Sequence, residues 1–101
     1  MRVIVFFDLP VGTASERRAY TSFRKFLIKN GFIMIQESVY SKLALNATVS
    51  EAIMKRVREE SPTVGIVQML TVTEKQYSKM EYIVGDKKSG TLDTDERLVI
   101  L

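Results

Sequence analysis

The 101-residue chain contains no cysteine and no histidine. Without cysteine the protein has neither a disulfide framework nor a thiolate metal site. Without histidine it lacks the commonest general base, the usual zinc ligand and the side chain that titrates near neutral pH. Catalytic mechanisms that depend on these groups are excluded, so a metal site in this protein needs oxygen ligands.

The sequence also lacks a long apolar segment. No apolar run approaches the ~18 residues of a membrane span, and Met1-Arg2 leads into an expected strand and not into a signal peptide. We therefore expect a cytoplasmic protein that does not bind membranes. A chain of 101 residues is expected to form one domain. We expect residues 1–80 to form its core, and residues 81–101 to add strands and a loop that contact a second protomer and other partners.

Positive charge is concentrated in the first half of the chain. Residues 1–42 contain seven basic and three acidic side chains, a net charge of +4, whereas residues 43–101 contain eight basic and nine acidic side chains, a net charge of −1. An excess of one sign in one segment favours a polyanionic partner, although a solvated basic helix has the same composition. The charge pattern leaves both interpretations open.

A short apolar segment, residues 2–7, runs into Asp8 and is stopped by Pro10. An apolar run bounded by a chain breaker predicts a buried strand, so Asp8 lies where this strand leaves the sheet. A carboxylate in that position either holds a hard cation or caps a turn. The first alternative indicates a nuclease and the second a scaffold.

The segment Thr13-Ala-Ser-Glu16 has the form of a capping box and predicts a helix that runs to about Asn30 and ends at Gly31. At about 100° per residue, one face of this helix is apolar and packs on the core, while its flanks are basic. The apolar face consists of Ala19, Tyr20, Phe23, Phe26 and Leu27. The flanks are the candidate nucleic-acid surface: one carries Arg18, Lys25 and Lys29, and the other carries Arg17 and Arg24.

Two strands, at about residues 32–36 and 38–45, are expected next. The whole segment is too long for one typical strand of about 5–6 residues, and Gln36-Glu37 interrupts it. A second capping box, Thr48-Val-Ser-Glu51, predicts a helix that runs to about Glu60. The expected inner face of this helix consists of Val49, Ala52, Ile53 and Val57.

Further strands are expected at residues 65–73, 82–85 and 97–101, with a short helical turn after Thr73 and a polar loop at 86–95. The order of the elements predicts an α+β fold of the ferredoxin-like βαββαβ type, with an antiparallel sheet and an extra C-terminal strand. The terminal strand follows a long polar loop. We therefore expect residues 96–101 to be swapped in a homodimer, where they would cover an exposed edge of the partner's sheet.

Several segments together are similar to one known family. They are VIVFFDLP at residues 3–10, the pair Arg17-Arg18, FRKFL at 23–27, the GF and QESVYS parts of 31–41, and TVTEKQ at 71–76. On these residues, over nearly its whole length, the chain resembles CRISPR-associated protein two, the small adaptation subunit that partners the CRISPR integrase. It is most similar to members from systems with a single large effector nuclease.

The resemblance implies a homodimer that bridges two dimers of the integrase, CRISPR-associated protein one, and contacts the backbone of a double-stranded DNA prespacer during spacer integration. The main interpretation is therefore a non-catalytic DNA-binding scaffold, with the integration chemistry in the integrase. The resemblance also implies phosphate contacts from a basic pair before the last strand. The expected DNA-binding residues are Arg17, Arg18, Arg24, Lys25, Lys87 and Lys88.

Some members of this family are metal-dependent nucleases, which implies an alternative function. In this alternative Asp8 of each protomer holds Mg²⁺ and the dimer is an endonuclease of DNA or RNA. One carboxylate per chain is few ligands for metal-assisted hydrolysis, but two Asp8 copies facing each other across a dimer axis would double the set. Asp8 is the one candidate catalytic residue. A small-ligand regulatory domain lacks support, because the sequence has no glycine-rich or polar ligand loop.

Overall fold

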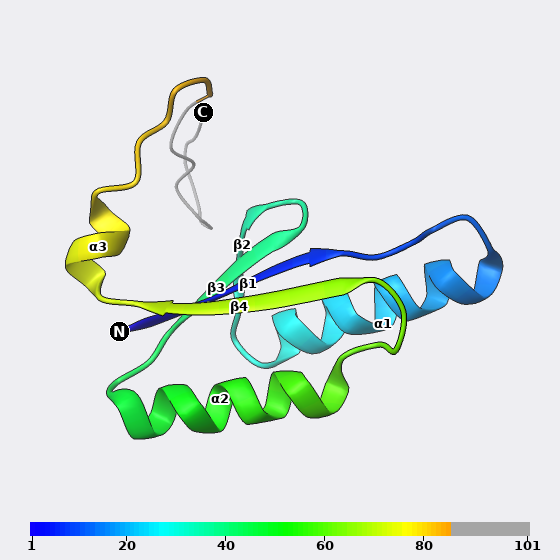
Figure 1. The fold of residues 1–101 in the computed structure, drawn as a ribbon, viewed down its shortest axis with the longest axis horizontal. Coiled ribbons are helices and arrows are strands. Elements are labelled where there is room, and N and C mark those ends of the chain that lie inside the picture. Colours follow the sequence, from blue (N-terminus) through cyan, green and yellow to red (C-terminus); the bar gives the residue numbers. More distant parts are fainter. Residues whose placement is uncertain (86–101) are drawn as a thin grey trace.

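A computed structural model describes residues 1–85 of the chain (Figure 1). Four strands form one antiparallel sheet in the order β2-β3-β1-β4, and two long helices lie on one side of it. This arrangement confirms the predicted α+β, ferredoxin-like fold. The elements are β1 (Arg2–Asp8), α1 (Ala14–Lys29), β2 (Ile33–Gln36), β3 (Val39–Leu43), α2 (Ala47–Glu60), β4 (Ile66–Val72) and the short α3 (Glu74–Ser78).

Strand β1 lies in the interior of the sheet and determines its two faces. Val3, Val5 and Phe7 are buried in the core beneath the helices. Since side chains alternate along a strand, Arg2, Ile4, Phe6 and Asp8 point to the opposite face, which no long helix covers (Figure 1). We call this second face the open face. The end of β1 at Asp8 confirms the strand end that the sequence predicts.

The core beneath the helices is centred on Phe7. Its ring lies edge-on to Phe23, with 5.3 Å between ring centroids, and stacks on Tyr40 at 5.7 Å. Tyr20 of α1 completes the cluster at 5.8 Å. Aromatic pairs in these geometries stabilise a fold by about 0.5–1.5 kcal/mol each beyond the burial of their surface. This cluster fixes α1 against the end of β1 that carries Asp8.

Helix α1 begins as the sequence predicts. Thr13 is its N-cap, the Glu16 amide donates to the Thr13 hydroxyl oxygen, and the Thr13 amide donates to the Glu16 carboxylate at 3.0 Å. The helix is buried mainly through Phe23 and Leu27. Ala19, which we expected on the buried face, is exposed.

The expected start and inner face of the second helix are partly wrong. Its N-cap is Asn46, whose side-chain oxygen accepts from the Val49 amide at 2.9 Å. Asn46 therefore takes the capping role that the sequence assigned to Thr48. The helix is buried through Val57 and Ser50, and the Ser50 hydroxyl lies 3.1 Å from that of Thr71 in β4.

The C-terminal part of the described chain is tied to the start of β1. The Arg2 guanidinium donates to Glu74 of α3 at 2.7 and 3.0 Å and lies 4.1 Å from the centroid of the Tyr77 ring. This hydrogen bonding lowers the pKa of Glu74 and raises that of Arg2. The expected strand at 82–85 is wrong: residues 83–85 form bends, and Ile83 and Val84 are 85% and 90% exposed.

The expected swapped strand at residues 96–101, and the loop before it, lie outside the described residues. Within residues 1–85, the structure contains no helix with the length and apolarity needed to cross a membrane.

Candidate metal and nucleic-acid site

Asp8 is an exposed carboxylate at the end of β1, on the open face. Its backbone is paired with Ile66, the first residue of β4. The preceding residue, Phe7, is anchored in the aromatic cluster, and its amide donates to the Ser38 carbonyl at 3.0 Å. Asp8 is thus a solvent-accessible oxygen ligand on a firmly held backbone.

Gly65, the residue before β4, lies close against the backbone of Asp8 and Leu9. Its φ is +97°, a conformation that glycine adopts without strain. A Cβ atom on residue 65 would lie 2.8 Å from the Asp8 carbonyl oxygen and 3.1 Å from the Leu9 Cα. Only glycine permits this close approach. Sequence reasoning missed this residue, although a glycine shortly after Pro62 and directly before a strand is a recognised turn signal.

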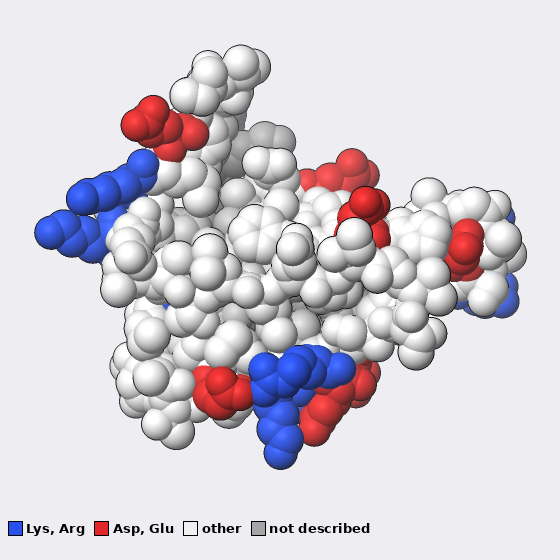
Figure 2. Space-filling view, viewed as in Figure 1, with Lys and Arg blue, Asp and Glu red and all other residues white. Residues whose placement is uncertain are grey.

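The open face carries exposed apolar side chains, with the polar Gln68 between two of them on β4. Four side chains on this face are more than half exposed, at 53–59%. They are Ile33, Leu43, Ile66 and Leu70, and the strand register places them on the same face as Asp8. Figure 2 shows a broad uncharged area around β4, with charged side chains at its margins. Several large apolar side chains exposed on one face of a sheet are typical of an interface with another protein surface.

One protomer alone does not provide a complete metal site. Among residues 1–85, no group of three or more acidic side chains lies together. A hard cation such as Mg²⁺ binds about six oxygen atoms and accepts one or two carboxylates when waters and substrate phosphates supply the rest. Asp8 therefore fits such an ion only as part of a shared set, for example with the same residue of a second protomer.

The expected DNA-binding residues divide between separate surfaces. Arg17, Arg18 and Lys25 line one shallow groove on α1. Arg24 lies on another flank of the helix, beside Gln36 and Glu37 of the β2–β3 hairpin, so it is not brought together with them. Arg17 also donates to two loop carbonyls, those of Val11 at 3.2 Å and Gly12 at 3.3 Å. The expected residues Lys87 and Lys88 lie outside the described residues.

Tyr40 carries the one buried side-chain polar atom in residues 1–85 that lacks a hydrogen-bond partner. The residue is fully buried in the core. Burial raises the pKa of its hydroxyl, and the charge of Arg24 opposes this shift. Its ring stacks on Phe7 in the aromatic cluster, so Tyr40 belongs to the core and not to the candidate site.

We expect Tyr40→Phe to leave the free energy of unfolding unchanged or to raise it by up to about 1 kcal/mol, because it removes a buried hydroxyl without a partner. Ser50→Ala is the contrast: it removes a hydroxyl that is bonded to Thr71, and should cost about 1–2 kcal/mol. Urea denaturation measures both. A loss above about 1.5 kcal/mol for Tyr40→Phe would mean that its hydroxyl is bonded in solution.

The sequence matches a known protein family over most of its length. The family described as "CRISPR associated protein Cas2" matches residues 1–80. The chain belongs to the Cas2 family. A relative from Treponema denticola is 60% identical over all 101 residues, which is the full length of both chains, and it is named CRISPR-associated endoribonuclease Cas2. A protein of the same name from Streptococcus mutans is 50% identical over the full chain and over 93% of its own length.

A solved structure supports the fold independently. The crystal structure of Streptococcus pyogenes Cas2 matches with a TM-score of 0.62 and 16% identity, covering 83% of this chain and all of that one. The family resemblance in the sequence is thus confirmed, and the protein is a Cas2-family component of CRISPR adaptation. The names of the relatives favour the nuclease alternative over the expected scaffold.

Proposed function

We propose that this Cas2-family protein is a metal-dependent endoribonuclease that acts as a homodimer, with Asp8 of each protomer in the active site. The observation that supports this most strongly is the Treponema denticola relative, 60% identical over both full lengths and named an endoribonuclease. The exposed position of Asp8 at the end of β1 agrees with this function. No other acidic cluster in residues 1–85 offers an alternative metal site.

The dimer forms through the open face in this proposal. Packing two copies of that face together would bury the exposed Ile66 and Leu70 and place the two Asp8 carboxylates at the same interface, since Asp8 is paired with Ile66. Symmetric association of this kind is the commonest form of oligomer. The outer edge of β4 has no strand partner among residues 1–85, which leaves it free to accept a strand.

In the dimer, the two Asp8 carboxylates would hold the divalent cation together with water and a substrate phosphate. A hard cation held by these carboxylates would stabilise the negative charge that develops on the phosphodiester. The groove of Arg17, Arg18 and Lys25 binds the backbone of the nucleic acid through phosphates, without reading its sequence. Since this chain has no histidine, no histidine side chain transfers a proton in the cleavage reaction.

Asp8→Asn tests the function because it keeps the shape of the side chain and removes its charge. We expect Mg²⁺- or Mn²⁺-stimulated cleavage of single-stranded RNA to fall by at least about 100-fold, because the metal loses a principal ligand. Glu37→Gln, at an exposed acid of the β2–β3 turn, is the matched control and should retain activity. Wild-type protein that cleaves no RNA with either metal, or a fully active Asp8→Asn protein, would contradict the proposal.

A second candidate is the DNA-binding scaffold of spacer integration, which the basic groove on α1 favours. In this case the dimer bridges integrase dimers and binds duplex DNA, and the chemistry takes place in the integrase. The same Asp8→Asn protein distinguishes the two functions. A scaffold keeps full integration activity with the integrase after this substitution, whether or not RNA cleavage occurs.

A further inference from the structure

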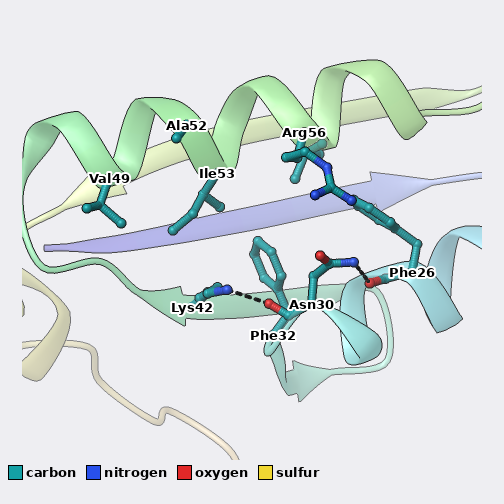
Figure 3. A pocket seen from close by; sticks show the side chains of 9 residues that line it. Phe26, Asn30, Phe32, Lys42, Val49, Ala52, Ile53 and Arg56 are labelled. Carbon is teal, nitrogen blue, oxygen red and sulfur yellow. Dashed lines mark hydrogen bonds between the residues drawn. The ribbon is translucent and has the colours of Figure 1, made fainter.

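A pocket of about 200 Å³ opens on the helical side of the molecule, between α2, the end of α1 and β3. Figure 3 shows Val49, Ala52 and Ile53 along one side of it, all from α2, with Phe32 opposite. Val49, Ala52 and Ile53 are residues that the sequence pattern predicts to be buried. Instead, Val49 and Ala52 are exposed and Ile53 is only partly buried, because α2 packs on the sheet through Ser50 and Val57. These apolar side chains of α2 therefore line the wall of the pocket.

Two cations accompany this apolar wall. The Lys42 ammonium donates to the Asn30 carbonyl at 2.5 Å, which leaves two of its three donors free of that bond. The Arg56 guanidinium lies 5.8 Å from the centroid of the Phe26 ring. Within residues 1–85 neither cation forms an ion pair, because the two ion pairs there join Arg2 to Glu74 and Arg58 to Glu51. Figure 3 shows Lys42 and Arg56 approaching the pocket from different sides.

The size of the pocket limits its occupant. Pockets for drug-sized ligands are about 300–1,000 Å³, so about 200 Å³ accommodates one large apolar side chain. The cations beside it are complementary to a negative charge on the same ligand. We propose that this pocket binds a peptide segment of a protein partner, in which one large apolar side chain lies next to a carboxylate.

The site goes beyond the proposed nuclease function. It lies beneath the sheet, on the side opposite the open face, so a dimer formed through that face leaves two copies of the pocket accessible. We favour a peptide over a nucleobase because most of the wall is aliphatic, from Val49, Ala52, Ile53 and Val57, and the ring of Phe32 opposite is only 4% exposed. The Asn30 side-chain amide donates one of its two hydrogens to the Phe26 carbonyl at 2.8 Å, which leaves the other for a carboxylate of the ligand.

A titration of the full-length, ¹⁵N-labelled protein tests the proposal by NMR. The probe is the capped dipeptide acetyl-leucyl-aspartyl-amide, compared with acetyl-leucyl-asparaginyl-amide, acetyl-glycyl-aspartyl-amide and thymidine monophosphate. We expect saturable shifts confined to the amides of Asn30, Ile53, Arg56 and their neighbours, with the charged leucyl peptide binding at least about 5-fold more tightly than either altered peptide. A single anchor of this kind corresponds to a Kd of about 1 mM.

Two variants and a control make the test specific. Arg56→Gln removes one positive charge beside the pocket, and Ala52→Phe fills the apolar part of the pocket. Each substitution should lower the affinity for the leucyl-aspartyl peptide by at least about 5-fold. Arg58→Gln, on the same helix but paired with Glu51 outside the pocket, should not change the affinity. The proposal is wrong if the peptide gives no localised, saturable shifts up to about 10 mM. It is also wrong if thymidine monophosphate binds these residues more tightly, which would indicate a nucleic-acid partner.

Discussion

Gly65→Ala is expected to destabilise the protein by about 2–4 kcal/mol and to abolish metal-dependent cleavage. The added Cβ would lie 2.8 Å from the Asp8 carbonyl oxygen, and the φ of +97° is strained for alanine. Rotation of the Leu9 side chain, whose Cδ2 would lie at 2.9 Å, cannot relieve the contact alone, because the Asp8 carbonyl oxygen and the Leu9 Cα belong to the backbone, so the end of β1 or the turn at Gly65 has to move. Thermal unfolding and RNA cleavage below the melting transition measure the two effects.

Two other glycines separate the causes of this effect. Gly85 also has a positive φ, +94°, but a Cβ there would have no neighbour within 4 Å among residues 1–85. Gly85→Ala therefore shows the cost of the backbone conformation alone, about 1 kcal/mol. Gly12→Ala would meet only a Glu16 oxygen at 3.4 Å and should be nearly neutral. If Gly65→Ala costs no more than Gly85→Ala, the approach of β4 to Asp8 is not tight.

Leu70→Asp is expected to convert the dimer into a monomer. Leu70 is 53% exposed on the open face, in the edge strand β4, where its backbone pairs with Ile4. In a symmetric dimer each substitution occurs twice, and each would bury an unpaired carboxylate. Burial of an unpaired charge costs several kcal/mol, so the dimer Kd should rise by at least about 100-fold. RNA cleavage should fall with the dimer, because the two Asp8 residues are separated.

Ile28→Asp is the matched control for the dimer surface. Ile28 is 47% exposed, close to the value of Leu70, but it lies on α1 in the helical layer. Sedimentation equilibrium should find this variant dimeric and the Leu70→Asp variant monomeric at the same concentration. A Leu70→Asp protein that remains dimeric and folded would show that the open face is not the interface.

The fold was largely predictable from the sequence because its signals are local. Pro10 and Asp8 end the first strand, and the capping boxes at Thr13 and Thr73 begin α1 and α3 as the sequence predicts. The start of α2 was misplaced by two residues, since Asn46 and Thr48 are both good N-caps and only backbone geometry decides between them.

The candidate site was predictable only in part, because its geometry depends on contacts between distant residues. The sequence identified Asp8 and placed it at a strand end, but the approach of Gly65 to the Asp8 backbone joins residues that are far apart in the chain. The helix period correctly separated Arg24 from Arg18 and Lys25, but it placed Arg17 with Arg24, whereas the structure places Arg17 in the groove with Arg18 and Lys25. The pocket beside α2 could not be predicted from the sequence, because Val49 and Ala52 are apolar at helical spacing and have the same pattern as buried core residues.

The most direct test of the account is cleavage by mixed dimers of wild-type and Asp8→Asn chains. The two proteins are mixed in varied proportions, allowed to exchange subunits, and assayed for Mn²⁺-stimulated cleavage of single-stranded RNA, with subunit exchange verified by native mass spectrometry. If both Asp8 carboxylates hold one site, only wild-type homodimers are active, and cleavage falls as the square of the wild-type fraction. A linear fall, in which mixed dimers keep half of the activity, would contradict the shared site.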